Sequence, residues 1–200
     1  MTRQDVVIVG AGMAGLVCAR RLQGAGYQTC LIEKSRGLGG RMATRRMEGI
    51  PTDHGARYLQ PQETLLMALT EAWVKQGLMT PWVPQTYILN AAGQLRPEDT
   101  AEPYYVAPMG MSSIGKALAA NLVIHKQQRV TAIAPSPGNT WQITAVVSTD
   151  NQTVQHTAKA IVLAIPAPQI LPLLEPLRSQ PEIAVLWAQL RTVRYTPCIT

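Results

Sequence analysis

The sequence contains no phenylalanine, and aromatic residues of all kinds make up only 5% of its 200 positions. Leucine, isoleucine, valine, methionine and tryptophan must therefore fill the interior, and the hydrophobic fraction of 46% is enough for a globular core. No apolar run reaches the roughly 20 residues that span a bilayer. Glycines at 10, 12 and 15 interrupt the apolar stretch near the N-terminus, which favours a strand, a turn and a helix over a signal peptide. We expect no membrane span.

Cysteine is also scarce, with three residues, Cys18, Cys30 and Cys198. They form no CxxC pair and show no metal-ligand spacing, so the sequence predicts no metal site. Cys18 falls in a helical pattern and Cys30 in a strand pattern, where cysteine is usually a small buried residue. So few thiols fit a reducing compartment, and we expect a cytoplasmic protein.

Charged residues are few, at 15%, but their balance is basic, with a net charge of +6. The chain has no long basic run and no patch of basic and aromatic residues, so nucleic acid is not the expected partner. Four arginines fall within eleven residues, which indicates either an uneven surface or an anionic ligand; they are Arg36, Arg41, Arg45 and Arg46. We interpret Arg45 and Arg46 as solvated surface residues.

The N-terminal residues predict a β-α-β unit. Residues 6–9 form a continuous apolar run, typical of a parallel strand that is buried on both faces. Residues 14–22 have helical character, and Gly24 and Gly26 are expected to end this helix. Residues 29–32 predict a second buried strand, which ends at Glu33.

The turn between the first strand and the helix matches the pattern GxGxxG, with glycines at 10, 12 and 15. Gly10 permits a tight turn, Gly12 lets a pyrophosphate approach the backbone, and Gly15 lets the helix pack close to the strand. The phosphates would meet backbone N–H groups at the positive end of the helix. We assign Met13 and Ala14, at the start of the helix, to the same site.

Glu33 lies eighteen residues after Gly15, at the end of the second strand. A carboxylate in this position can accept hydrogen bonds from both ribose hydroxyls of an adenosine. The turn and Glu33 together predict a site for an adenine dinucleotide. They do not choose between NAD and FAD, which share the ADP half.

The residues after Glu33 favour FAD over NAD, because they resemble a known family. Leu-Gly-Gly-Arg-Met-Ala-Thr at 38–44, together with Glu33-Lys34 and the glycine turn, resembles the flavin-containing amine oxidase superfamily. The resemblance implies that the backbone of Gly39 and Gly40 approaches the pyrophosphate and that Arg41 lies along the dinucleotide. It also places Lys34 in the site and implies non-covalent FAD as the cofactor.

Two further segments fit the same resemblance. Thr-Asp-His-Gly-Ala at 52–56 is similar to the family segment beside the isoalloxazine ring, which implies flavin contacts from His54, Gly55 and Ala56. His54 either faces the flavin or is a satisfied loop histidine, and we expect Asp53 to bond local backbone rather than to act as a base. Val130 either contacts the adenine, as the resemblance implies, or is an ordinary strand valine.

Five scattered strings resemble the renalase-like branch of this superfamily: GGRMATRR at 39–46, DHGARY at 53–58, PMGMS at 108–112, IPAPQ at 165–169 and YTPC at 195–198. The resemblance implies an α/β fold, with a Rossmann-like FAD-binding domain of the glutathione-reductase type and an inserted α+β substrate domain. We expect residues 1–58 and 106–168 to form the FAD-binding domain and residues 59–105 and 169–200 to form part of the substrate domain. Members of the branch are longer, so we expect the C-terminal part to be missing.

The renalase-like resemblance implies an FAD-dependent oxidase of isomeric reduced nicotinamide dinucleotides. Hydride would pass to flavin N5, and dioxygen would reoxidise the flavin and give hydrogen peroxide. No catalytic residue can be named, and neither the preference for NADH or NADPH nor the oligomeric state follows from the sequence. The alternatives are a primary-amine or polyamine oxidase, a carotenoid-type desaturase, and an inactive nucleotide-binding fragment.

The remaining patterns predict secondary structure only. Residues 41–58 predict a hairpin turning at Glu48-Gly49, and residues 64–76 predict a helix. A second hairpin is expected from strand 82–89 across Ala92-Gly93, and a helix from Ser112 or Ser113 to Leu122. The later elements are expected as three strands at 123–134, 140–148 and 153–163, a segment broken up by Pro166, Pro168 and Pro172, a helix at 181–190, and a last strand at 192–200.

Overall fold

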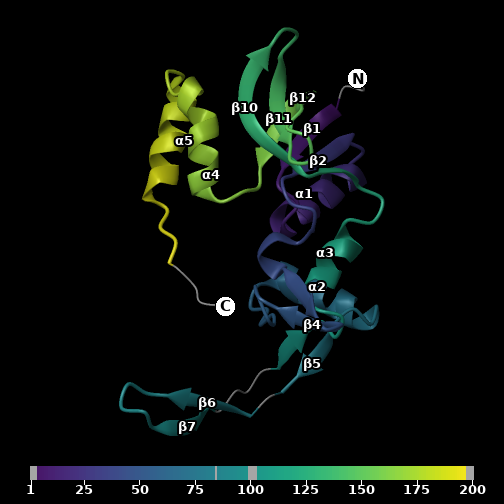
Figure 1. Cartoon of the computed structure of the whole chain (residues 1–200), viewed down its shortest axis with the longest axis vertical. Helices are drawn as coiled ribbons and strands as arrows, with labels where there is room; N and C mark the ends of the chain where they lie inside the picture. Colours follow the sequence, from purple (N-terminus) through teal and green to yellow (C-terminus); the bar gives the residue numbers. More distant parts are fainter. Residues whose placement is uncertain (1–3, 84, 99–102, 197–200) are drawn as a thin grey trace. The chain divides into compact units, whose positions relative to one another are not determined.

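The computed structural model describes residues 4–83, 85–98 and 103–196, and the chain divides into two compact units (Figure 1). The first unit is Met1–Arg41 with Gly115–Thr200, and the second is Met42–Ile114. These units do not follow the expected domain boundaries, since residues 42–58 and 106–114 group with the second unit and residues 169–200 with the first. Which residues serve the cofactor and which the substrate stays a prediction.

One six-stranded sheet, in the order β10-β11-β12-β1-β2-β9, forms the centre of the first unit. β12, β1, β2 and β9 run parallel to one another, whereas β10, β11 and β12 form an antiparallel meander. The strand bounds are β1 Gln4–Val9, β2 Thr29–Glu33, β9 Val123–Lys126, β10 Gln128–Ser136, β11 Thr140–Val147 and β12 Thr153–Leu163.

The N-terminal β-α-β unit has the arrangement that the sequence predicts. β2 is buried along its whole length, and α1 (Met13–Gly24) contacts β1 and β2. Alternate side chains of the two strands face the meander, among them Val7, Cys30 and Ile32, which pack in one apolar cluster with meander residues. The predicted end of the helix is also confirmed, because Gly24 is its last residue.

The predicted strand at 123–134 is wrong, because the chain breaks it into β9 and β10 at Gln127. Gln127 has a φ of 59°, in the left-handed region. Its N–H donates to Ser35 O at 3.3 Å, and its carbonyl accepts from Ser148 N at 2.8 Å. One residue therefore turns the chain from a pairing with β2 to a pairing with β11. The two later strands, β11 and β12, agree with the prediction.

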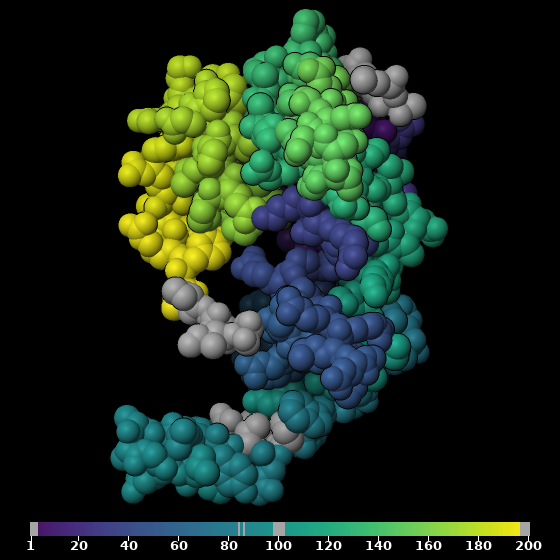
Figure 2. All heavy atoms as spheres, viewed as in Figure 1, coloured from purple at the N-terminus to yellow at the C-terminus, as the bar shows by residue number. Residues whose placement is uncertain are grey.

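The proline-rich segment after β12 is helical, which the sequence did not predict. It forms α4 (Ala167–Leu174), followed by η2 (Glu175–Leu177) and α5 (Pro181–Thr192). Pro168 lies in the first turn of α4, where a missing N–H breaks no helical bond, and Pro172 removes only one bond from a short helix. Ile170 and Leu173 pack against the meander, and α4 and α5 lie beside it in Figures 1 and 2.

The predicted last strand is not found over residues 193–196, which have no regular structure, and its remainder, including Cys198, lies outside the described residues. The predicted helix before it is confirmed as α5. None of the helices in the described part of the chain has the length and apolarity needed to cross a membrane.

The second unit consists of short antiparallel pairs and two helices. The first predicted hairpin is confirmed, and it turns through Glu48 and Gly49, both with positive φ. The second is confirmed only in part, because residues 80–82 pair separately with residues 104–106. The bounds are β3 Thr44–Met47, β4 Ile50–Asp53, α2 Thr64–Lys75, β5 Thr80–Trp82, β6 Thr86–Leu89, β7 Leu95–Glu98 and β8 Tyr104–Val106.

The helix α3 (Ser112–Leu118) runs from the second unit into the first. It begins where the sequence predicts but ends four residues before Leu122, ahead of Asn121, whose φ is 64°. The expected serine cap is not what holds its start. The Ser113 hydroxyl is buried without a hydrogen-bond partner among the described residues, and the N–H of Ser112 donates to Thr44 Oγ1 at 3.0 Å instead.

Candidate functional site

The glycine turn between β1 and α1 is so tightly packed that two of its positions exclude any side chain. Gly10 has a φ of 102°, and a Cβ there would lie 2.7 Å from the carbonyl oxygen of Ala164. A Cβ on Gly15 would lie 2.0 Å from the carbonyl oxygen of Gly10. The tight turn and the close approach of helix to strand therefore both require glycine.

Gly12 is different, because the space beside it is open. A Cβ on Gly12 would have no neighbour nearer than Gly40 Cα, at 3.9 Å. Gly12 precedes α1 with extended backbone, no side chain caps the helix start, and the first turn contains no acidic residue. The first N–H groups of a helix, here those of Met13 and Ala14, have no partner within the helix. Open space before uncapped N–H groups fits the phosphates of a dinucleotide.

The second glycine tract lies directly beside the first. Gly39 forms a parallel bridge with Gly12, and its N–H donates to Ala11 O at 2.9 Å. A Cβ on Gly40 would lie 3.1 Å from Gly12 Cα, and a Cβ on Gly115 would lie 2.8 Å from Gly39 Cα. The backbones of four glycines, Gly12, Gly39, Gly40 and Gly115, therefore lie in close contact. Arg41 follows immediately in η1 (Gly40–Met42), with its side chain exposed.

Glu33 ends β2 next to the glycine turn. Its side chain is buried, with 8% of the residue exposed, and it links two loops. Oε2 accepts a hydrogen bond from Ala11 N and Oε1 accepts one from Ser35 N, both at 2.7 Å. An ionised carboxylate has about four acceptor positions, so two are left for ribose hydroxyls. The carboxyl end of a parallel strand is where such sheets bind ligands.

Two other predicted residues of the first unit are placed less clearly for a ligand. Lys34 is exposed, and its Nζ donates to Gln169 Oε1 at 3.0 Å, so in this structure it is tied to α4. Val130 is half-buried in β10, and the pairing with β11 shifts between Val130 and Ala132. Such a bulge changes the direction of a strand locally and frees backbone groups from the ladder.

The remaining predicted residues, His54, Gly55 and Ala56, follow β4 in the second unit. The His54 side chain is exposed, and its backbone N–H donates to Ala43 O at 3.3 Å. Because these residues belong to the other compact unit, their part in the cofactor site stays a prediction. Arg45 and Arg46 are exposed, as expected for solvated residues.

Asp53 bonds a backbone N–H, as predicted, but the partner is not local. Its Oδ1 accepts from Met111 N, 58 residues further along, at 2.9 Å, and from Thr44 Oγ1 at 2.5 Å. A Cβ on Gly110, which has a φ of 87°, would lie 2.4 Å from Thr44 Cγ2. The β3–β4 hairpin therefore holds the start of α3. No spacing in the sequence connects these positions.

The parallel sheet with its glycine turn, its meander and the glutamate at the end of β2 define a Rossmann-like FAD-binding fold. Residues 8–72 match the model of the NAD(P)-binding Rossmann-like domain, and residues 88–200 match that of the flavin containing amine oxidoreductases. The chain belongs to the flavin-containing amine oxidoreductase family, and FAD is the cofactor that this membership implies.

Curated relatives in this family include oxidases of amines. The chain is 42% identical over 65 residues to a putative flavin-containing monoamine oxidase of Mycobacterium tuberculosis, which covers 32% of this chain and 14% of the relative. It is 34% identical over 113 residues to putrescine oxidase of Kocuria rosea, covering 56% of this chain and 22% of that protein. The chain therefore matches only a small part of the length of these relatives.

Solved structures agree with the fold at low sequence identity. Wild-type putrescine oxidase bound to putrescine has a TM-score of 0.66 at 15% identity, over 86% of this chain and 60% of that one. A putative protoporphyrinogen oxidase from Exiguobacterium has a TM-score of 0.68 at 16% identity, over 90% of this chain and 64% of that one.

Proposed function

We propose that this chain forms the FAD-binding part of an FAD-dependent oxidoreductase. The observation that carries the proposal is the contact between the two glycine tracts, Gly12 with Gly39, beside the buried carboxylate of Glu33. When bound, FAD supplies the redox chemistry by accepting a hydride and passing the electrons on. What the chain itself supplies is binding and orientation of the dinucleotide.

Each predicted residue has a proposed task in holding FAD. The N–H groups of Met13 and Ala14 face the pyrophosphate across the open space at Gly12, and the backbone of Gly39 and Gly40 lies along it. Glu33 accepts hydrogen bonds from the ribose. The other assignments are Gly10 and Gly15 for the turn itself, Lys34 and Arg41 for the charge of the dinucleotide, Val130 for the adenine, and His54, Gly55 and Ala56 for the flavin ring.

For the substrate we propose a reduced nicotinamide dinucleotide in an isomeric dihydro form. The renalase-like strings support this substrate, and a net charge of +6 suits a ligand that carries phosphates. Hydride transfer from a dihydropyridine needs no general base, so the absence of an identifiable base among the motifs does not oppose it. Stacking and orientation of the two rings are then the main contribution of the protein.

A primary amine is the second candidate substrate. It is favoured by the curated relatives, which are named as a monoamine oxidase and a putrescine oxidase. The similarity to the monoamine oxidase covers only 32% of this chain, and the glycine tracts that bind a dinucleotide are indifferent to the substrate. The two candidates therefore share a cofactor site and differ in what reduces the flavin.

Anaerobic stopped-flow spectroscopy of the FAD-loaded full-length protein distinguishes them. We expect dihydronicotinamide isomers to bleach the flavin absorbance within one turnover and putrescine to leave it unchanged, with hydrogen peroxide forming when oxygen is readmitted. Rapid bleaching by putrescine alone would establish the second candidate. A protein that cannot be loaded with FAD at all would refute the oxidoreductase proposal.

The substitution Glu33→Gln tests the cofactor site itself. We expect FAD affinity to fall by about 1–3 kcal/mol in an equilibrium titration, because a charged acceptor toward the ribose is lost. Glu175→Gln is the control, since Glu175 is an exposed carboxylate paired with Arg178 in the same unit. Urea unfolding without flavin separates the lost Ala11 and Ser35 contacts from ligand binding. Equal FAD affinity in both variants would contradict the ribose role.

A further inference from the structure

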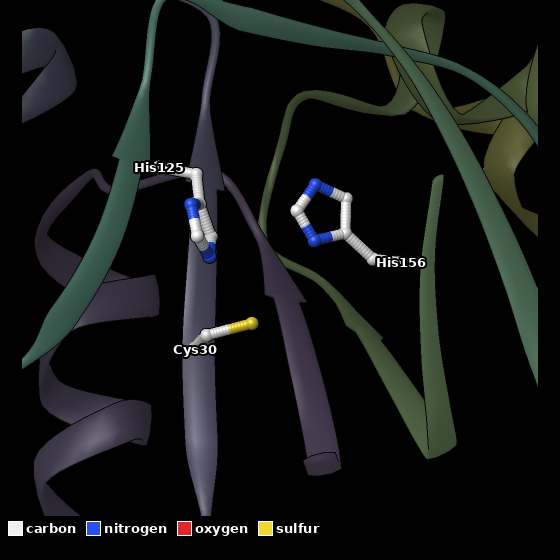
Figure 3. Close-up of side chains that lie close together, drawn as sticks. All are labelled: Cys30, His125 and His156. Atoms are coloured by element: carbon white, nitrogen blue, oxygen red, sulfur yellow. The ribbon is translucent and has the colours of Figure 1, made fainter. Parts of the chain in front are cut away.

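Three side chains that lie far apart in the sequence meet inside the first unit. Cys30 comes from β2, His125 from β9 and His156 from β12, and one ligand atom from each lies within 4.8 Å of the other two (Figure 3). Residues 30, 125 and 156 have no spacing that indicates a site, which explains why the sequence predicts none.

The strand register accounts for the meeting. β2 and β9 are parallel neighbours in which Cys30 pairs with Val123 and Ile32 with His125, so Cys30 and His125 lie two residues apart on the same face. His156 lies in the meander part of β12, opposite Ile143 of β11. Cys30 and Ile143 belong to one buried cluster, which brings the meander onto this face of the sheet. All three side chains are thus carried by strands, which position them more firmly than loops do.

The two imidazoles lie close together, and one of them has an outer hydrogen-bond partner. Their ring centroids are 4.8 Å apart, and no hydrogen bond joins any two of the three side chains in the described structure. Nε2 of His156 lies 2.9 Å from Gln128 Oε1, an oxygen that only accepts, so Nε2 carries the proton and Nδ1 has its lone pair available. In Figure 3, Nδ1 of His156, the ring nitrogen next to the carbon that joins the ring to the side chain, faces Cys30 and His125. A hydrogen bond from the far nitrogen is the usual way in which a ligating histidine is oriented.

The composition of the cluster selects the metal. One thiol and two imidazoles are the ligands of zinc, and of other borderline or soft ions such as copper. Ligand atoms around a tetrahedral zinc are about 3.3–3.6 Å apart, given bonds of about 2.0–2.3 Å. The widest pair here, at no more than 4.8 Å, must therefore close by roughly 1.5 Å at most.

The cysteine of the cluster is fully buried, whereas the two histidines are only half-buried. Cys30 is 1% exposed, and its burial raises the pKa of the thiol to about 11. The two histidines are half-buried, so part of each residue is accessible to solvent. The ion must displace the thiol proton, a cost that a divalent cation offsets by binding the thiolate directly.

We propose that Cys30, His125 and His156 form a zinc-binding site with three protein ligands and a fourth position open to water or to a small ligand. The site ties β2 and β9 to β12, so an ion would hold the meander to the parallel sheet. This proposal is independent of the proposed redox function.

The test is a titration of the metal-free chain with Zn²⁺ by calorimetry and with Co²⁺ by absorption spectroscopy. We expect one ion per chain, a raised melting temperature, and a sulfur-to-cobalt charge-transfer band with the visible bands of tetrahedral Co²⁺. Cys30→Ala should remove the charge-transfer band, and His125→Asn or His156→Asn should weaken zinc binding at least tenfold. Gln128→Leu, which removes only the outer hydrogen bond, should weaken it by roughly 10–100-fold.

Matched controls come from the same chain. Cys18→Ala removes a half-buried thiol of α1, and His54→Asn removes the exposed histidine of the second unit; both should bind zinc like the parent. The proposal is overturned if the parent binds no zinc, if binding persists in the cysteine and histidine variants, or if the cobalt spectrum lacks the sulfur band. If Cys30→Ala fails to fold, the Gln128→Leu and His125→Asn titrations decide the question in its place, and unchanged zinc affinity in both overturns the proposal.

Discussion

At the scale of single residues, two of the three glycines in the turn between β1 and α1 have no room for a Cβ. Gly10 and Gly15 are excluded from substitution by backbone atoms 2.7 and 2.0 Å from the ideal Cβ position. Gly12 is sterically open, so packing does not account for its glycine, whereas the proposed approach of a pyrophosphate would. The same motif thus contains two glycines that the fold requires and one to which we assign a role in the proposed cofactor site.

Gly15→Ala should lower the free energy of unfolding by at least about 2 kcal/mol, because the new methyl group collides with the carbonyl of Gly10. The measurement is urea unfolding followed by circular dichroism. Gly24→Ala is the matched control at the other end of α1, where a Cβ has no neighbour within 4 Å; it should be neutral or stabilise slightly. Similar stability of the two variants would contradict the packing role of Gly15.

At the scale of elements, regular structure is held together by contacts that cross from one element to another. The β3–β4 hairpin supplies Thr44 and Asp53 to the start of α3, in place of a serine cap from the helix itself. Likewise, α4 forms in spite of Pro172 because its apolar side chains pack on the meander. Local propensity is overridden in both cases by tertiary contacts.

Thr44→Val tests the hairpin contact, since it keeps the shape of the side chain and removes its hydroxyl. We expect a loss of about 1–3 kcal/mol in unfolding free energy, because Ser112 N and Asp53 Oδ1 each lose a hydrogen-bond partner. Thr52→Val, at an exposed position of the same hairpin, should change stability by less than about 0.5 kcal/mol. An equal effect of both substitutions would mean that the hydroxyl contributes nothing.

At the scale of the whole molecule, the first unit is discontinuous in sequence, from Met1–Arg41 and Gly115–Thr200. Its two segments meet where the second unit is inserted, because Gly115 contacts the backbone of Gly39. The parallel sheet also draws on both segments, with β2 between β1 and β9. The first unit should therefore fold without the second.

Replacing residues 42–114 by a short glycine linker tests this. We expect cooperative thermal unfolding and native strand content by circular dichroism, since every strand of the six-stranded sheet is retained. A second variant ending at Arg41 is the control; it lacks β9 to β12 and should not fold. Loss of cooperative unfolding in the linker variant would show that the first unit depends on the second.

Local patterns in the sequence were sufficient to predict helices and strands where a residue type has a single structural role, as glycine has in a tight turn. The apolar run at 6–9, the glycine turn and Glu33 predicted β1, α1 and β2, because buried parallel strands and helix starts have strong local patterns. They were insufficient at Gln127 and in the segment of Pro168 and Pro172. A left-handed residue other than glycine and a packed proline helix have no local signature.

The sequence by itself determined the dinucleotide turn, the flavin family and most helices and strands, since these depend on residues that are close in the chain. Only the tertiary structure decided which distant residues meet. It pairs Gly39 with Gly12, and it brings the Asp53 carboxylate to the backbone N–H of Met111. It also places Cys30 beside two histidines about 95 and 126 residues further along the chain. Strand register and sheet packing set these meetings, and no periodicity in the sequence encodes them.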